Sequence, residues 1–272
     1  MIKVFVDSGS SIKQSEKEKY DVEILPLKIL LEDKEYLDGI DLEMNKFYDF
    51  LINKKLFPKT SLPSLDVVEE KVNECVNNGD DVIILSISSG ISGTYNAFNL
   101  LFSDNDKVRV IDTQTACGGV RILVNEINKY KQEGIDKVLE VINYLIPRIR
   151  ACAVPETLSY LHKGGRLGSA GYIAGSLLNL KPIIELRNKV SVVGKTLGLN
   201  KAMKELVSIL EVADTNYPIV PSYTYCDKNL DLLISKTNED LQKAMIEKDN
   251  LDPAIACHWG PNAFGFFFVE KN

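Results

Sequence analysis

The sequence is poor in the residues that build disulfide frameworks and metal sites. Its 272 residues include five cysteines, two histidines and one tryptophan. The cysteines are odd in number, widely spaced and without a C-x-x-C pair, which argues against a disulfide scaffold and against a zinc site. We expect reduced cysteines in a cytoplasmic protein that holds no metal and no cofactor.

An excess of positive charge and long apolar runs are also missing. The formal net charge is -6, whereas a nucleic-acid-binding protein is expected to carry a basic stripe. No apolar run approaches the length that spans a membrane, and the chain opens on a strand-like pattern rather than a leader. We therefore expect no nucleic-acid partner and, at most, transient contact with a membrane surface.

The first half of the chain alternates short apolar runs with helical periodicity. This alternation predicts a Rossmann-like α/β domain, a parallel sheet with helices on both faces. Ligands of such sheets bind beyond the carboxyl ends of the strands. Each of the three predicted strands given below is followed by a hydroxyl-rich loop. Strands are predicted at 2–6, 82–87 and 108–111, and helices at 42–54, 65–77, 95–102, 119–132 and 135–148.

The second half has fewer helices between its strand-like runs. It fits an α+β domain with a mixed sheet better than a continuation of the first pattern. We expect two domains, residues 1–150 and 151–272, with the ligand at their interface. Strands are predicted at 151–154, 182–186, 190–193, 219–223, 254–257 and 266–269, and helices at 199–213 and 230–248.

The run VIILSISSGISGTY is the most informative stretch for function. Its apolar part, 82–87, predicts a buried strand, and Gly90 and Gly93 permit a tight turn before the helix expected at 95–102. A helix N-terminus preceded by glycines attracts anions, because backbone N–H groups point at the ligand. Hydroxyls in loop 88–95 add donors, so this loop can hold a phosphate or a carboxylate without a lysine or arginine.

Three further motifs carry candidate site residues. Thr60 and Ser61 lie in TSLPS, Arg166 lies in KGGRLG, and His258 lies in CHWGPNAFG between two predicted strands. Each also has an ordinary explanation, as a turn residue, a surface cation or a hydrogen-bonded structural histidine. Taken alone, none of these motifs decides between a functional and a structural role.

One enzymatic alternative is a serine esterase or acyltransferase. Ser92 would be the nucleophile, His258 the base, and Asp7 or Asp112 the residue that orients the histidine. The local sequence GISGT lacks the closing glycine of a nucleophile elbow, because Thr94 stands there. A triad can form on other frameworks, so the alternative stays open.

A second alternative is a phosphate- or nucleotide-binding protein that uses loop 88–95. The residues GKT at 194–196 match the end of a phosphate-binding Walker A loop. The leading glycine of that motif would have to stand at position 189, which is Lys189. A P-loop is therefore excluded, and only the serine-rich loop supports this alternative.

Taken together, the motifs resemble those of the DegV family over essentially the whole chain. Members of that family are two-domain α/β proteins that bind one long-chain fatty acid, and some are the acyl-carrying subunit of bacterial fatty acid kinase. There a separate kinase subunit phosphorylates the bound carboxylate to an acyl phosphate. The matching blocks are TSLPS (60–64), SSGISGTY (88–95), TLSYLHKGGR (157–166), LLNLKPII (177–184) and HWGPNAFG (258–265).

The resemblance implies a carboxylate-binding site without catalysis of its own. Thr60 and Ser92 match the family's carboxylate ligands, the Gly93 amide is a third donor, and His258 lies close to the same head group. The implied ligand is a C14 to C18 fatty acid such as palmitate. Further contacts are expected from Ser61, Thr94 and Arg166.

The acyl chain would need an apolar tunnel, for which the second domain offers candidates. One departure from the family is Asn262, which replaces the second glycine of the closing Gly-Pro-Gly turn. Asn tolerates left-handed backbone geometry, so we expect the turn to survive. The tunnel candidates are Ile173, Leu177, Leu178, Ile184, Phe264, Phe266 and Phe268.

Overall fold

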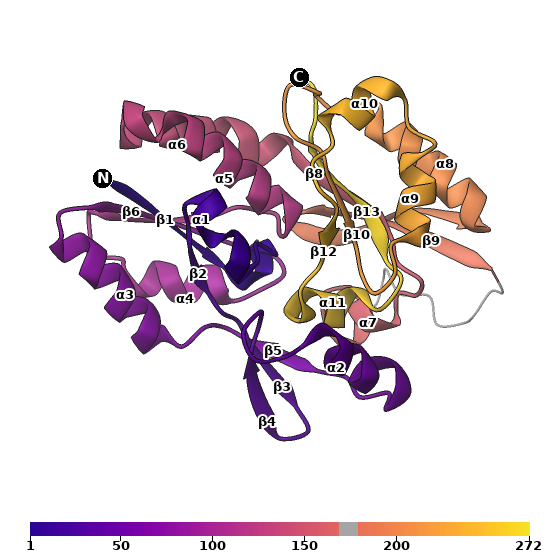
Figure 1. The fold of residues 1–272 in the computed structure, drawn as a ribbon, viewed down its shortest axis with the longest axis horizontal. Coiled ribbons are helices and arrows are strands. Elements are labelled where there is room, and N and C mark those ends of the chain that lie inside the picture. Colours follow the sequence, from indigo (N-terminus) through magenta and orange to yellow (C-terminus); the bar gives the residue numbers. More distant parts are fainter. Residues whose placement is uncertain (169–178) are drawn as a thin grey trace.

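The computed structural model describes residues 1–168 and 179–272, which form two large sheets and one small sheet with packed helices (Figure 1). Ile173, Leu177 and Leu178, three of the tunnel candidates, lie outside the described residues. No helix in the described part of the chain is long and apolar enough to cross a membrane.

The first large sheet has four strands, and every neighbouring pair is parallel. Its strands are β1 (Ile2–Asp7), β2 (Glu23–Leu25), β6 (Asp81–Ser86) and β7 (Val108–Asp112), in the order β2-β1-β6-β7, and two of its helices are α3 (Leu65–Asn77) and α4 (Thr94–Leu101). Phe5 and Ile84 pack against these two helices, whereas Val6 and Leu85 face the core shared with the second sheet. The parallel α/β prediction is confirmed.

A small antiparallel sheet, which the sequence reasoning missed, follows β2. It consists of β3 (Lys28–Leu31), β4 (Lys34–Leu37) and β5 (Lys59–Ser61), with α2 (Met44–Tyr48) and the π-helical turn η3 (Asp49–Asn53) between β4 and β5. Glu32 and Asp33 join β3 to β4, and both have positive φ, +49° and +60°. Positive φ at both turn residues is the I′ hairpin geometry, which Asn-Gly pairs usually signal. A Glu-Asp turn carries no such signal.

The second large sheet is mixed and has six strands. All of its pairs are antiparallel except β11 with β12. The predicted mixed sheet is therefore confirmed. Its strands are β8 (Ile149–Val154), β9 (Leu180–Arg187), β10 (Lys189–Leu197), β11 (Val220–Tyr223), β12 (Asp249–Asn250) and β13 (Phe264–Val269), in the order β10-β9-β8-β13-β11-β12.

Helices cover both faces of this second sheet. On one face α8 (Leu199–Leu210) and α9 (Lys228–Ile234) contact β13, and Phe266 and Phe268 pack beneath them. On the other face α5 (Gly118–Tyr130) contacts β8, β11 and β13 and lies between the two large sheets (Figure 1). A Cβ on Gly118 would lie 2.7 Å from the Val220 side chain, so this close approach requires a glycine.

Two predictions in the second half are wrong. Residues 254–257 are not a strand but part of α11 (Pro253–Trp259), in which Pro253 is the first helical residue and Asp252 occupies the N-cap position. The expected helix 230–248 is broken, because α10 (Glu239–Ala244) starts afresh where the Asn238 side chain accepts a hydrogen bond from Leu241 N. Both errors missed helix-start residues of well-known type.

The remaining short elements connect these layers. α6 packs beside α5, and α7 packs beside α11. These elements are η1 (Ser8–Ser10), η2 (Gln14–Glu16), α1 (Lys17–Tyr20), η4 (Lys131–Glu133), α6 (Ile135–Leu145), η5 (Ile146–Arg148) and α7 (Ser159–Lys163).

The division into two domains at residue 150 stays a prediction. β8 begins at Ile149, close to that boundary. However, α5 precedes the boundary and packs on the second sheet, so the two halves share one buried core. That shared core encloses the site described next.

Candidate functional site

A cavity of about 280 Å³ lies between the two halves of the molecule. The polar side of its wall contains six of the residues expected at the site. The remaining wall is apolar and comes mainly from loops that follow strands of the first large sheet, from β9 and β10 of the second, and from α7 and α11. The polar residues are Thr60, Ser61, Ser92, Gly93, Arg166 and His258, and the apolar ones are Leu27, Leu62, Ile87, Ile91, Ala116, Leu161, Leu186, Val190, Ala254, Ile255 and Trp259.

In the loop after β6, several backbone N–H groups donate hydrogen bonds to another residue of the same loop. The N–H groups of Ile91 and Ser92 both donate to Ser88 O at 3.1 Å, and Gly90 N donates to Ser88 Oγ at 3.1 Å. Gly93 N has no acceptor among the described residues. A phosphate cradle needs several free amides, so this loop suits a single carboxylate better than a phosphate.

Ser92 and Thr94 form a hydroxyl pair at the start of α4. Their oxygens lie 2.8 Å apart, and Thr94 N donates to Ser92 Oγ at 3.3 Å. Thr94 is fully buried and does not reach the cavity. When the Thr94 hydroxyl donates to Ser92 Oγ, the Ser92 proton is free to point at a ligand.

Buried Asp7 holds this loop from below. Its carboxylate accepts hydrogen bonds from Gly9 N and Ile87 N, both at 2.9 Å, and from Ser86 Oγ at 3.1 Å. Burial raises the pKa of Asp7 to about 6, although the three hydrogen bonds act in the opposite direction. Asp7 therefore positions the loop and does not contact His258.

His258 contacts the small sheet through Thr60. The Nε2 atom lies 3.0 Å from Thr60 Oγ1. Burial, together with the positive charge of Arg166, lowers the pKa of His258 to about 3. The ring is therefore neutral at physiological pH. With the proton on Nε2, the histidine donates to Thr60 Oγ1 and leaves the threonine hydroxyl free to donate into the cavity.

Arg166 brings a cation to the cavity wall, which the serine-rich loop alone did not suggest. Its Nε donates to Ile91 O at 3.0 Å, and Nη1 donates to Gly164 O. The side chain thus ties the turn after α7 to the loop after β6. Its guanidinium group therefore brings positive charge to the cavity wall.

Helix α11 is held at its N-terminus by Asp38, a second buried carboxyl group. Asp38 Oδ1 accepts from Ala254 N at 3.0 Å, and Oδ2 accepts from Ser8 Oγ at 2.7 Å. Burial and the nearby charge of Asp252 raise the pKa of Asp38 well above its ordinary value. This contact orients the helix that carries His258.

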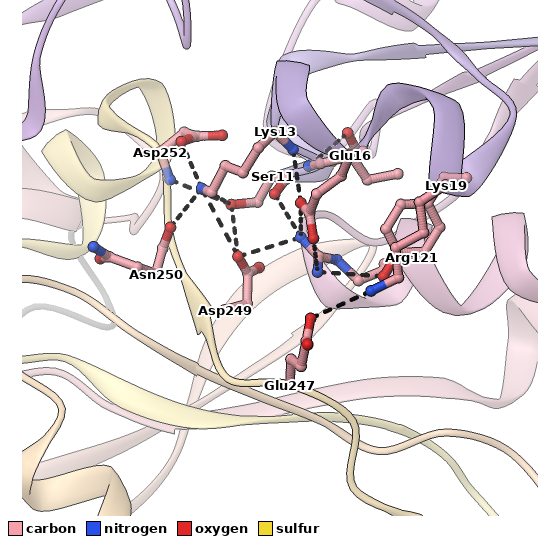
Figure 2. A network of polar contacts seen from close by, with 12 residues as sticks. Ser11, Lys13, Glu16, Lys19, Arg121, Glu247, Asp249, Asn250 and Asp252 are labelled. Atoms are coloured by element: carbon pink, nitrogen blue, oxygen red, sulfur yellow. Dashed lines mark hydrogen bonds and ion pairs between the residues drawn. The ribbon is translucent and has the colours of Figure 1, made fainter.

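A buried ionic network ties the start of α11 to the first half of the chain (Figure 2). Lys13 Nζ donates to Asp252 Oδ1 at 2.6 Å. Arg121 Nη2 lies 3.2 Å from Glu16 Oε2 and 3.5 Å from Asp249 Oδ1. Asp249 and Arg121 are almost fully buried, so the network acts as a fixed joint between the two halves rather than as a ligand site.

The esterase triad is not formed by the described residues. His258 Nε2 contacts Thr60 instead of Ser92, and Nδ1 has no hydrogen-bond partner. Asp112, the other candidate for orienting the histidine, instead accepts from Ser89 N and Ser89 Oγ. A base whose pKa lies near 3 is also poorly matched to proton abstraction at neutral pH.

The tunnel candidates that the structure describes do not line this cavity. Ile184 is buried in the shared core behind the wall. Phe264, Phe266 and Phe268 belong to the core beneath α8 and α9, although the first two also border a second, much smaller cavity. The three phenylalanines share one face of β13, and that face is turned away from the main cavity.

The turn after α11 keeps the geometry expected of its family pattern. Asn262 has φ +61° and Gly260 has φ +75°. Asn262 Nδ2 also donates to Glu156 Oε2 at 2.9 Å. A Cβ on Gly260 would lie 2.3 Å from the Tyr160 ring, so α11 and α7 approach closely only because this position is glycine.

The fold and the site define an α/β protein whose parallel and mixed sheets enclose a largely apolar cavity with a polar cluster on one side. The DegV family model matches residues 1–271, and the chain belongs to the DegV family. A DegV domain-containing protein of Clostridium acetobutylicum is 29% identical over 283 residues, which cover 99% of each chain.

Solved structures show the same fold. A fatty acid binding DegV family protein of Streptococcus agalactiae superposes with a TM-score of 0.89 at 26% identity, covering 100% of this chain and 99% of the other. A DegV family protein of Thermus thermophilus, described by its fatty acid binding, gives a TM-score of 0.86 at 27% identity and covers 99% of each chain. The DegV fold expected from the motifs is therefore confirmed.

Sequence reasoning missed Asp38 and Trp259 as residues that build the site. Asp38 stands in a D-G pair that resembles a turn, and its role depends on a contact with Ala254, 216 positions away. Trp259 is the only tryptophan of the chain and follows His258 directly. Being the chain's one tryptophan is the signal in the sequence that could have drawn attention to it.

Proposed function

We propose that this protein binds one long-chain fatty acid, with its carboxylate at Thr60, Ser92 and the Gly93 amide and its tail in the apolar part of the cavity. The observation that carries the proposal is the single cavity in which these donors meet a largely apolar wall. The names of the Streptococcus and Thermus relatives, which describe fatty acid binding, support the same ligand.

The polar wall suits a carboxylate in charge and in donor number. Each hydrogen bond to a charged group contributes about 1.5 to 3 kcal/mol, which offsets the cost of removing the head group from water. His258 acts through Thr60 by fixing which way that hydroxyl donates. Arg166 supplies a nearby positive charge while its Nε is engaged by Ile91 O.

The tail supplies most of the affinity. Burying about fourteen methylenes at ~0.8 kcal/mol each amounts to roughly 11 kcal/mol before the costs of association. The polar contacts then select an acid over an apolar molecule of similar length. We therefore infer a C14 to C18 fatty acid, such as palmitate, as the ligand.

We further propose that the protein presents the acid to a separate kinase subunit and has no catalytic residue of its own. A carboxylate held by neutral hydroxyls keeps a nucleophilic oxygen. That oxygen would attack the γ-phosphorus of ATP bound to the kinase, forming an acyl phosphate while the bond to ADP breaks. The same arrangement makes Ser92 a ligand rather than a nucleophile, because His258 does not contact it.

Lipid extraction tests the binding proposal. We expect organic solvent to release close to one C14 to C18 fatty acid per molecule of recombinant protein, as measured by mass spectrometry. Thr60→Ala combined with Ser92→Ala should lower retention about 10- to 100-fold, since two hydrogen bonds to the carboxylate are lost. The matched control is Ser103→Ala with Thr196→Ala, which removes the same two hydroxyl types away from the cavity.

Two outcomes would count against this function. Protein that carries no lipid and hydrolyses acyl esters would favour the esterase alternative. Equal lipid content in the double variant and its control would place the head group elsewhere. The kinase proposal has its own test, in which loaded protein, ATP and a fatty acid kinase catalytic subunit are mixed with hydroxylamine; absence of the hydroxamate would reject the presenting role alone.

A further inference from the structure

Trp259 stands between two cavities. It lines the main cavity described above, and it also borders a second cavity of about 10 Å³. No other described residue borders both. Trp259 is 8% exposed and packs in the shared core at the C-terminal end of α11.

The two cavities lie over adjoining strands of the same sheet. Leu186 of β9 lines the main cavity, and its register partner on β8, Ala151, borders the small one. Leu186, Ala151 and Phe267 all belong to the shared core, so they lie on the same side of the sheet. Trp259 therefore separates two neighbouring cavities.

Small residues line the space behind the tryptophan, namely Ala151, Ala153, Ala263 and Gly265. Ala153 pairs with Gly265 across β8 and β13, and a Cβ on Gly265 would lie 2.6 Å from the Ala153 side chain. The border is mostly apolar and includes the Ser222 hydroxyl. At about 10 Å³, the space as it stands is the size of one water molecule and cannot admit an acyl chain.

We propose that Trp259 is the end wall of the acyl site and sets the longest fatty acid that the protein retains. The inference rests on the proposed function and adds a specificity-determining residue to it. The main cavity of about 280 Å³ is at the small end for a ligand site, and Trp259 is part of its wall. A tail that runs toward the second sheet is therefore stopped by the indole. Removing the indole joins the two cavities and provides room for additional methylenes.

Competitive loading of the intact protein tests this. Delipidated protein is offered an equimolar mixture of saturated C14 to C22 acids, and the retained acids are quantified by mass spectrometry. In Trp259→Ala, the ratio of C20 to C16 acid should rise at least tenfold over wild type, because each extra buried methylene multiplies affinity about fourfold. Trp259→Leu, which better preserves the core, should shift the ratio in the same direction by less.

Two further variants distinguish loss of the end wall from a general loosening of the core. Phe268→Ala removes a fully buried aromatic residue that borders neither cavity, and its chain-length profile should match wild type. Adding Ala151→Leu to Trp259→Ala refills the small cavity and should restore the original profile.

The outcomes of this test are distinct from those of the proposed function. Variants that bind fatty acid with an unchanged C20 to C16 ratio would overturn the role of Trp259 and leave fatty acid binding intact. An equal shift in Phe268→Ala would also overturn it. Wild-type protein that takes up no acid at all would reject the function itself, and the end wall with it.

Discussion

The two walls of the cavity are built in opposite ways. The first is a loop that follows directly from a buried strand, and the amides of Gly90, Ile91 and Ser92 in its turn all donate to Ser88. The second is α11, a helix whose N-terminal end is held by Asp38 and Lys13 from distant parts of the chain. Hydrogen bonds within the loop shape the turn that carries Ser92, whereas long-range contacts position the helix that carries His258.

Removing the ionic joint should have the largest effect on this comparison. Arg121→Met takes the guanidinium away from both Glu16 and buried Asp249, which keeps only Ser11 Oγ at 3.3 Å and Lys13 Nζ at 3.9 Å. We expect the free energy of unfolding to fall by about 3 to 5 kcal/mol. Lys243→Met is the control, because its pair with Glu239 is exposed and its loss should cost less than about 1 kcal/mol. Urea unfolding measures both, and equal losses would show that the buried network does not hold the second wall.

The second largest difference is expected when a methyl group is added to each wall by a glycine-to-alanine substitution. Gly260→Ala places a Cβ 2.3 Å from the Tyr160 ring at φ +75°, whereas a Cβ on Gly93 meets nothing within 4 Å. We expect Gly260→Ala to cost about 2 to 4 kcal/mol and Gly93→Ala less than about 0.5 kcal/mol. Melting temperatures test the difference; a larger loss for Gly93→Ala would reverse the assignment of which wall is tightly packed.

The first wall should lose stability as pH rises. Burial raises the pKa of Asp7 from its ordinary value of 3.8 to about 6 in the folded protein, so its contribution is complete below about 4 and is lost as pH rises to about 6. Asp7→Asn should remove up to about 3 kcal/mol of this pH dependence. The Asp7→Asn substitution also weakens hydrogen bonds, but that loss does not vary with pH. Unfolding curves at pH 4 and pH 6.5 therefore separate the loss of titration from the loss of hydrogen bonds. An unchanged slope would rule out the buried carboxyl as its source.

The second wall should respond to pH in the opposite direction and somewhat less. Burial lowers the pKa of His258 from 6.5 to about 3, so its contribution is complete above about 6.5 and is lost as pH falls toward 3. His258→Gln keeps a hydrogen-bonding group near Thr60 without titrating in this range. The fall in unfolding free energy between pH 7 and pH 5 should shrink by about 2 kcal/mol. The same fall in variant and wild type would place the titration elsewhere.

Prediction from sequence succeeded where the signal was local. The apolar run before the glycines predicted β6, its loop and α4, and Ser92 and Gly93 both reach the cavity. Sequence reasoning failed for α11 because the short apolar run 254–257 fits a buried strand as well as a buried helix. Pro253 at the first helical position was the cue that favoured a helix.

The prediction of the acyl tunnel failed for a different reason. Phe264, Phe266 and Phe268 were expected to line the tunnel because they are large apolar residues of the second half. The structure packs Phe266 and Phe268 against the helices of the second half, while Phe267 and Val269 face the shared core. Alternation defines which residues share a face, but only packing decides what each face meets.

The sequence by itself determined the α/β class, the family, and the loop that presents Ser92 and Gly93, because those follow from periodicity, glycines and motif order along the chain. Only the tertiary structure decided that His258 contacts Thr60, 198 positions away. It also placed Arg166 at the cavity and Trp259 between two cavities. The physical reason is that burial and hydrogen-bond partners depend on which segments pack together, and distant segments leave no mark on each other's local pattern.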